Sequence, residues 1–251
     1  MLNQNMCYEY LSDSECTKYT QSMNTFTLCY LIKGRKRITD ACLAFQSQNL
    51  PDNWSMRLYI DPSTVINAPD CATVIDYPQV GALGRSFDFM VRDAAEHAGT
   101  DYIVTMGQDN ILIDRAFDLL ETTAEAGKRF AGFNKYGAVS QHGAVSIYSA
   151  APFGAGRMVS SELYLKTAEV HGFVYPHICE RGLDGAASQR IYSATGVYPT
   201  TINTEYPMVY DFKSDENLHG WEEIASDRRA SKIWLLPEVS DVQRVIYGEA
   251  L

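Results

Sequence analysis

Residues 84–109, GRSFDFMVRDAAEHAGTDYIVTMGQD, join an amphipathic helix to a buried strand that ends on a carboxylate. The helical part, 84–99, ends in Gly99 and has apolar residues at helical spacing: Phe87, Met90, Val91 and Ala94. The apolar run 101–106 predicts a strand, and the turn sequence Gly107-Gln108-Asp109-Asn110 follows it. Asp109 is therefore either a metal or phosphate ligand, or a turn residue that, like Asn110, could cap a helix beginning at Ile111.

The segments on either side repeat this alternation of strand and helix. Apolar, β-rich runs predict strands, and amphipathic runs predict helices, one of which is ended by Pro51. The expected strands are 25–32, 56–61 and 72–77, and the expected helices are 38–50 and 111–127. Such alternation predicts βαβ units and a mainly parallel sheet, in which ligands bind beyond the carboxyl ends of the strands. Asp61 and Asp109 both fall at such ends.

The second half of the chain has a different pattern. We expect strands at 129–137, 144–150 and 200–205, a glycine-bearing loop at 151–161, helices at 162–172 and within 181–196, a polar loop at 210–221 and a helical C-terminal region. The chain therefore divides into an N-terminal extension, 1–24, and a single domain, 25–251. Within this domain, 25–127 is the expected nucleotide-binding half, and 128–251 is the more irregular half with the helical C-terminal region.

Composition excludes several classes of protein. A net charge of −10 over 251 residues argues against a broad basic face for nucleic acid, although KGRKR, 33–37, could form a local anion site. The six cysteines have no metal-ligand spacing, which favours buried thiols in a reducing compartment, and hence a cytoplasmic protein. No apolar run approaches the roughly 18–20 residues of a membrane span, and the N-terminus has no secretory-signal pattern.

Five segments in order carry a family resemblance. They are YLIKGRKR, YIDPST, the helix with Arg92-Asp93 and its strand ending at Asp109, the glycine loop FGAGRMVSS, and GLDGAASQR. Over about residues 25–220 the chain resembles the GT-A-fold glycosyltransferases, which use nucleotide sugars. The resemblance implies an α/β, Rossmann-like, mainly parallel central sheet flanked by helices, with a nucleotide-sugar donor such as a UDP-sugar and a divalent cation, Mn²⁺ or Mg²⁺. Two acids of the family pattern are missing, because Gly107 replaces the first Asp of DxD and Leu183 replaces the Glu before Asp184.

The resemblance also implies roles for the donor-side residues. Asp61 would bind the ribose or base, Asp109 and His219 the metal, and a further set the base, diphosphate or sugar: Lys33, Arg35, Arg37, Arg85, Arg92, Gly154 and Gly156. Each has a structural alternative: a DPST turn for Asp61, solvated charges for the basic run, helix-surface salt bridges for Arg85 and Arg92, and plain exposure for His219, with which His142 competes.

On the acceptor side, Asp184 is the candidate general base, and such a base favours an inverting transfer. The alternative for Asp184 is a cap of a helix beginning at Gly185. Tyr210 and Trp221 could form an aromatic platform for a sugar, or belong to the core.

The sequence thus predicts a glycosyltransferase of the hexosyl- or pentosyltransferase class. Two alternatives stay open: a nucleotidyltransferase on a related fold, and a non-catalytic nucleotide-sugar-binding protein that has lost the two acids. The acceptor is left open among a sugar, a small molecule, a protein and a modified nucleobase, and a homo-oligomer is compatible with the sequence.

Overall fold

The computed structural model describes residues 24–34, 36–79, 81–140, 145–149, 154–179, 182–213, 231–233 and 236–247. The expected N-terminal extension lies outside these ranges except for Asn24. Within them, no helix is both long enough and apolar enough to cross a membrane.

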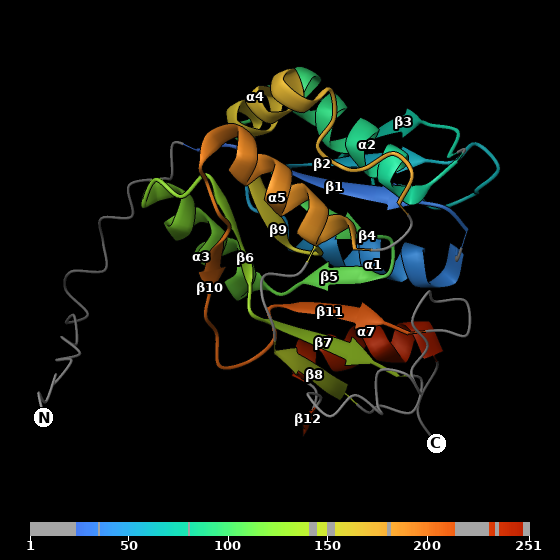
Figure 1. Ribbon diagram of the computed structural model, residues 1–251. Coiled ribbons are helices and arrows are strands. Elements are labelled where there is room, and N and C mark those ends of the chain that lie inside the picture. Colours follow the sequence, from blue (N-terminus) through green and yellow to red (C-terminus); the bar gives the residue numbers. More distant parts are fainter. Residues whose placement is uncertain are drawn as a thin grey trace, which may run out of the picture.

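A seven-stranded sheet forms the centre of the molecule (Figure 1), with the strand order β10-β6-β9-β4-β1-β2-β3. Its strands are β1 (Phe26–Ile32), β2 (Trp54–Ile60), β3 (Ala72–Asp76), β4 (Tyr102–Gly107), β6 (Phe130–Phe133), β9 (Arg157–Ser160) and β10 (Thr200–Ile202). The β1–β2, β1–β4, β2–β3 and β6–β10 pairs are parallel, and only β9 runs antiparallel to its neighbours. Every residue of β1 is buried, as expected for a central strand covered on both faces. The predicted, mainly parallel sheet is confirmed.

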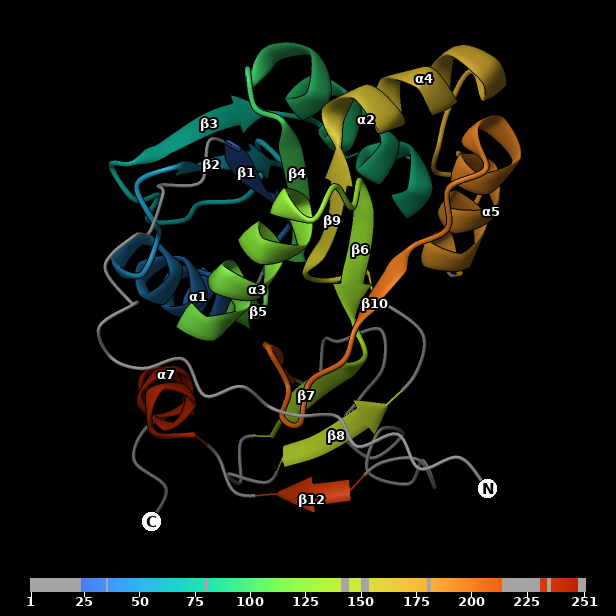
Figure 2. The ribbon, with the colours of Figure 1, turned by 90° about the vertical axis from the view of Figure 1, so that its left-hand side faces the viewer.

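Helices cover both faces of this sheet, as Figure 2 shows. The helices on one face are α1 (Lys36–Gln48) and α3 (Asp114–Glu125), and those on the other are α2 (Leu83–His97), α4 (Ser161–His171) and α5 (Leu183–Thr195). The C-terminal helix α7 (Pro237–Tyr247) packs against α1, and its Gln243 side chain donates to the Ser140 carbonyl at 3.3 Å. Each group packs its apolar side chains into a separate core cluster. Burial raises the pKa of the Cys29 and Cys42 thiols within this interior, which agrees with cysteine as an inert apolar filler.

A second sheet, which the sequence did not predict, has the order β12-β8-β7-β11-β5. Its strands are β5 (Asn110–Leu112), β7 (Lys135–Val139), β8 (Val145–Ser149), β11 (Val209–Phe212) and β12 (Ser231–Ile233). Three expectations are wrong here. The helix expected from Ile111 begins at Asp114, the polar loop expected at 210–221 begins inside a buried strand, and the single strand expected at 129–137 is two strands in different sheets.

The physical reason for these errors is long-range pairing. β5 and β11 are short strands that pair antiparallel with each other although nearly 100 positions separate them in the sequence. Three or four residues carry too little periodicity to distinguish a strand from a turn or the start of a helix. The two halves of the sequence also contribute to both sheets. β9, from the second half, lies between β4 and β6 in the central sheet, and β5, from the first half, forms an edge of the second sheet.

Gly84, in the first turn of α2, is required by close packing. A Cβ atom at this position would lie 2.0 Å from the carbonyl oxygen of Pro176, and the Gly84 amide donates to the Cys179 carbonyl at 3.0 Å. Alanine in place of a helical glycine normally stabilises by about 1 kcal/mol. Here a backbone atom occupies the space, so we expect Gly84→Ala to lower the free energy of unfolding by about 1–3 kcal/mol in urea denaturation.

Gly185→Ala is the matched control for this prediction. Gly185 lies in the first turn of α5, and a Cβ atom there would meet nothing within 4 Å. We expect this variant to be as stable as the wild type or more so. Equal stabilities for the two variants would contradict the packing argument for Gly84.

Candidate active site

Asp61 lies directly after β2, in the predicted DPST turn. One carboxylate oxygen accepts from the Ser63 amide at 3.0 Å and from the Ser63 hydroxyl at 2.5 Å, and the other accepts from the Gln79 amide at 3.1 Å. These hydrogen bonds, that of the Ser63 hydroxyl first, lower the pKa of Asp61. The DPST turn, the structural alternative for Asp61, is therefore present. The same turn holds the ionised Asp61 carboxylate in a fixed orientation at the edge of the sheet.

Hydrogen bonds connect the loops after β1, β2, β3 and β4. The Lys33 amide donates to the Gln108 side chain at 2.7 Å, and the Gly34 amide donates to the Thr64 hydroxyl at 2.9 Å. The Lys33 ammonium group reaches the Gln79 carbonyl at 3.3 Å. Lys33 and Asp61 therefore lie at one carboxyl edge, with Gln79 bonded to both.

Asp109 lies in the turn between β4 and β5 and is only 8% exposed. The helix-capping alternative is wrong, because Ile113 precedes the first residue of α3 and the Asn110 carboxamide oxygen instead accepts from the Gly107 amide at 2.9 Å. A Cβ atom on Gly107 would lie 2.6 Å from this Asn110 oxygen and 3.1 Å from an Asp109 carboxylate oxygen. A side chain at position 107 would therefore displace the Asn110 carboxamide from its hydrogen bond with the backbone amide of that position.

A second buried carboxylate, Asp211, was missed by the sequence analysis. In the antiparallel β5–β11 pair Asp211 lies opposite Asn110, and the neighbouring Phe212 amide donates to the Asp109 carbonyl at 2.9 Å. Asp211 is 3% exposed, and its Oδ2 atom pairs with the Lys213 ammonium group. Its Oδ1 atom has no hydrogen-bond partner among the described residues. The apolar residues around Asp211 were the only sequence signal, and they lay at the edge of a segment predicted to be a loop.

Asp184 lies in the first turn of α5, which begins at Leu183, so the predicted cap of a helix beginning at Gly185 is wrong. Its side chain is half exposed. A Cβ atom on Gly154 would lie 2.2 Å from Asp184 Oδ1, so the glycine loop is in direct contact with this carboxylate. The same loop is attached to β4, because the Thr105 hydroxyl donates to the Gly154 carbonyl and the Gly156 amide to the Thr105 carbonyl, both at 2.8 Å. The structure therefore brings Gly154, Gly156 and Asp184 together near the carboxyl end of β4.

Arg157, at the start of β9, is the second functional candidate that the sequence analysis missed. It is 4% exposed, and its Nη1 atom donates to the Asp184 carbonyl at 2.9 Å and lies 3.8 Å from Asp184 Oδ1. Its guanidinium also lies over the Phe130 ring, 5.5 Å from the centroid. A buried cation held between a strand and the first turn of α5 fixes the Asp184 carboxylate beside the glycine loop.

The remaining expected site residues lie elsewhere. Arg85 and Arg92 line a cavity on the outer side of α2, and Arg92 donates to the Gly172 carbonyl at 2.5 Å and pairs with Asp88 at 3.5 Å. Arg92 therefore makes the helix-surface salt bridge of the structural alternative. Tyr210 is fully buried and belongs to the core, not to an aromatic platform. Four further candidates lie outside the described residues: Arg35, His142, His219 and Trp221.

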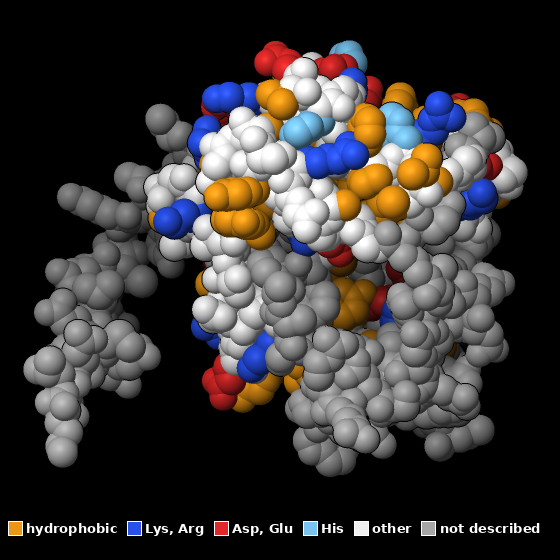
Figure 3. Space-filling model, in the orientation of Figure 1, with side chains coloured by type: hydrophobic (Ala, Val, Ile, Leu, Met, Phe, Trp, Pro, Cys, Tyr) orange, Lys and Arg blue, Asp and Glu red, His pale blue; other side chains and the backbone are white. Residues whose placement is uncertain are grey.

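Figure 3 shows that the face carrying α5 is hollowed beside the start of this helix, above β5 and β11. Hydrophobic and acidic side chains are visible in the hollow. Within the described ranges, no three histidine, cysteine, aspartate or glutamate side chains gather as a complete metal site. The two buried carboxylates described beside the β4–β5 turn are those of Asp109 and Asp211.

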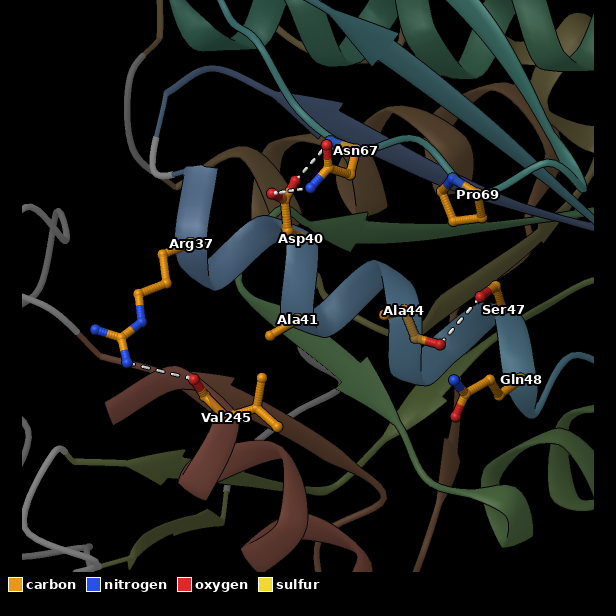
Figure 4. Close-up of a pocket in the computed structure, with 9 residues that line it drawn as sticks. All are labelled: Arg37, Asp40, Ala41, Ala44, Ser47, Gln48, Asn67, Pro69 and Val245. Atoms are coloured by element: carbon orange, nitrogen blue, oxygen red, sulfur yellow. Dashed lines mark hydrogen bonds between the residues drawn. The ribbon is translucent and has the colours of Figure 1, made fainter. Parts of the chain in front are cut away.

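A separate cavity of about 500 Å³ lies against α1, next to α7 and the segment after β2 (Figure 4). Its polar side chains already bond to neighbours: Asp40 accepts from the Asn67 amide at 2.7 Å and side chain at 3.0 Å, and Arg37 reaches the Val245 carbonyl at 3.5 Å. Arg37 thus bonds to α7 and lies in a different cavity from the one that contains Arg85 and Arg92.

The architecture of the central sheet and its helices matches a known fold. A mostly parallel seven-stranded sheet flanked by helices is the GT-A-like glycosyltransferase fold, as expected from the sequence. Among solved structures, the chain is similar to residues 1–349 of the glycosyltransferase TarS from S. aureus in complex with UDP-GlcNAc. The TM-score is 0.51 at 11% identity, over 88% of this chain and 65% of the TarS chain.

A second structure of the same TarS region matches with a TM-score of 0.48 at 10% identity, over 75% of this chain and 60% of that one. The chain therefore spans less than two thirds of the TarS chains it matches. No protein-family model and no curated protein matches the sequence.

Proposed function

We propose that the protein transfers a sugar from a nucleotide-sugar donor to a hydroxyl group of an acceptor. One observation carries this proposal: carboxylates with different surroundings meet at one carboxyl edge of a GT-A-like sheet. Asp61 and Asp109 follow β2 and β4 there, and Asp184 reaches the same edge through its contact with the glycine loop that Thr105 holds. Ligand binding outside the carboxyl ends of the strands is general for open α/β sheets.

Asp61 and Lys33 are the proposed donor-binding groups. The Asp61 carboxylate, already oriented by Ser63 and Gln79, can accept protons from the ribose hydroxyls or the base. The exposed Lys33 ammonium group lies at the same edge and can neutralise phosphate charge. UDP-GlcNAc in the TarS complex makes a UDP-sugar the first donor to test.

Asp109 and Asp211 are the residues that would hold a divalent cation. Both are buried at neighbouring strand ends, and the Asp211 oxygen without a hydrogen-bond partner is a suitable ligand for a hard cation. When bound, Mn²⁺ or Mg²⁺ would stabilise the negative charge of the departing nucleoside diphosphate. Asp211 would thereby supply the second carboxylate that Gly107 cannot, and Lys213 adds a fixed positive charge beside it.

Asp184 is the proposed base. Its half-exposed carboxylate can take the proton of the acceptor hydroxyl while that oxygen attacks the anomeric carbon of the sugar. Arg157 holds the first turn of α5 in place, and Gly154 leaves the space that the carboxylate occupies. Attack assisted by a single base on the acceptor side gives inversion at the anomeric carbon.

Calorimetric titration of UDP- and GDP-sugars, with and without Mn²⁺, tests the donor and the metal together. We expect saturable binding of one donor class that Mn²⁺ strengthens, because a cation held by Asp109 and Asp211 would neutralise negative charge of the diphosphate. Asp109→Asn should weaken direct Mn²⁺ binding at least tenfold and remove the strengthening.

Asp118→Asn is the matched control, since Asp118 is an exposed carboxylate on α3. This variant should bind donor and metal as the wild type does. Absence of binding by any nucleotide sugar would overturn the proposed function. Unchanged Mn²⁺ binding in Asp109→Asn would overturn only the metal assignment.

A further inference from the structure

A second polar cavity, of about 250 Å³, lies on the outer side of α2 against the segment between α4 and α5. Its side-chain walls are two arginines, a histidine, an aspartate and two aromatic rings: Arg85, Arg92, His177, Asp88, Tyr77 and Phe89. Figure 3 shows basic, histidine and hydrophobic side chains gathered over this part of the molecule. Pockets for whole small molecules usually exceed about 300 Å³, so this cavity suits one chemical group rather than a complete nucleotide.

Asp88 holds the cationic side chains of this cavity in place. Its Oδ2 atom lies 3.1 Å from His177 Nε2 and 3.5 Å from an Arg92 guanidinium nitrogen. Its Oδ1 atom accepts from the Tyr164 hydroxyl at 2.7 Å and from the Val174 and Tyr175 amides at 2.7 and 3.1 Å. Hydrogen-bond donors around both oxygens compensate the negative charge of the buried Asp88 carboxylate. Asp88 in turn orients Arg92 and His177, so the part of the cavity away from Asp88 is basic.

Arg85 supplies the exposed positive charge. It lies seven residues before Arg92 on α2, on the same side of the helix, and makes no ion pair with any described residue. Tyr77 and Phe89 stack next to it with ring centroids 4.1 Å apart, and Phe89 is 38% exposed. The cavity thus offers guanidinium and imidazole donors beside an apolar aromatic wall.

We propose that this cavity binds a phosphate group carried by a small ligand, at a site separate from the donor edge. A phosphate presents oxygens in several directions, which suits two guanidinium groups and an imidazole better than the two coplanar oxygens of a carboxylate. Lys33, Asp61 and Asp109, which we assign to donor and metal binding, are not among the described residues that line the cavity. The inference therefore does not rest on the proposed glycosyl transfer.

The site is connected to the acceptor side through Asp88. This carboxylate binds the Val174 and Tyr175 amides, in the segment that leads to α5 and Asp184. A phosphate bridging Arg85 and His177 ties α2 more firmly to that segment. Occupancy of the cavity therefore stabilises the segment on which the position of Asp184 depends.

Isothermal titration with inorganic phosphate, at constant ionic strength, tests the proposal on the full chain. We expect saturable binding that Arg85→Gln weakens at least tenfold, because a bidentate contact is lost. Arg85 is exposed and has no structural partner among the described residues, so this variant should fold. Arg115→Gln removes an exposed arginine from α3 and serves as the matched control, with unchanged affinity.

Asp61→Asn distinguishes this cavity from the donor edge. Phosphate binding that persists in Asp61→Asn and is lost in Arg85→Gln supports the proposal. The proposal is overturned if the wild type shows no saturable heat, if Arg85→Gln binds as the wild type does, or if Arg115→Gln weakens binding equally. A nucleotide sugar that competes with the bound phosphate would also overturn it, because the two ligands would then share one site.

Discussion

Asp184→Asn is expected to reduce kcat for glycosyl transfer by about 10²- to 10⁴-fold, the usual contribution of a positioned general base. The carboxamide has nearly the same size and can occupy the space beside Gly154, but it cannot take the proton of the acceptor hydroxyl. Donor binding should be unchanged, because Asp61 and Asp109 lie at the ends of other strands. Steady-state kinetics with the identified donor, together with calorimetric donor titration, measure the two quantities separately.

Asp118→Asn provides the control for Asp184→Asn as well, because it removes an exposed carboxylate from another helix. Asp184 also lies in the first turn of α5, where a negative charge stabilises the helix by about 0.3–1 kcal/mol, so the melting temperature should fall only slightly. Equal kcat values for Asp184→Asn and the wild type would exclude Asp184 as the base. A loss of donor affinity equal to the loss of kcat would indicate a binding role instead.

Asp88→Ala is expected to have the largest effect on stability, lowering the free energy of unfolding by about 3–5 kcal/mol. Asp88 is 3% exposed, and its removal leaves the Val174 and Tyr175 amides without their acceptor and Arg92 without its ion pair. Burial, and then the Asp88 charge, raise the pKa of Tyr164, so its hydroxyl remains a donor, which in the alanine variant keeps only the Asp88 backbone carbonyl at 3.0 Å. The small helix-propensity gain of alanine cannot offset these losses.

Urea denaturation of Asp88→Ala, Asp88→Asn and Asp118→Ala tests this expectation. The asparagine variant keeps an acceptor for the two backbone amides and should lose less stability than the alanine variant. Asp118→Ala alters only an exposed side chain and should remain within about 0.5 kcal/mol of the wild type. An Asp88→Ala variant as stable as Asp118→Ala would show that the hydrogen bonds of Asp88 contribute little to stability.

The candidate site was predictable from sequence where it depends on strand ends. Asp61 and Asp109 could be assigned to one edge because both follow buried strands of a parallel sheet, and parallel strands have their carboxyl ends on the same side. The family resemblance supplied separate roles for the glycine loop and for Asp184, and the contact between Gly154 and Asp184 is seen only in the structure. The phosphate roles expected for Arg85 and Arg92 came from the family resemblance and from guanidinium chemistry, neither of which shows which neighbouring segment covers the helix.

Asp211, Arg157 and Asp88 show what local patterns could not reveal. Each is a charged residue in an apolar segment, and its importance comes from partners far away in the sequence: Asn110 and Asp109 for Asp211, Asp184 for Arg157, and Val174 and Tyr175 for Asp88.

The sequence by itself determined the alternation of helices and strands, the mainly parallel sheet and the edge at which Asp61 and Asp109 lie. These features follow from periodicity, which depends on residues close together in the chain. Only the tertiary structure decided the second sheet, the pairing of β5 with β11, and the burial of Asp211 and Arg157. These features depend on contacts between distant segments, whose formation is governed by the packing of the whole core.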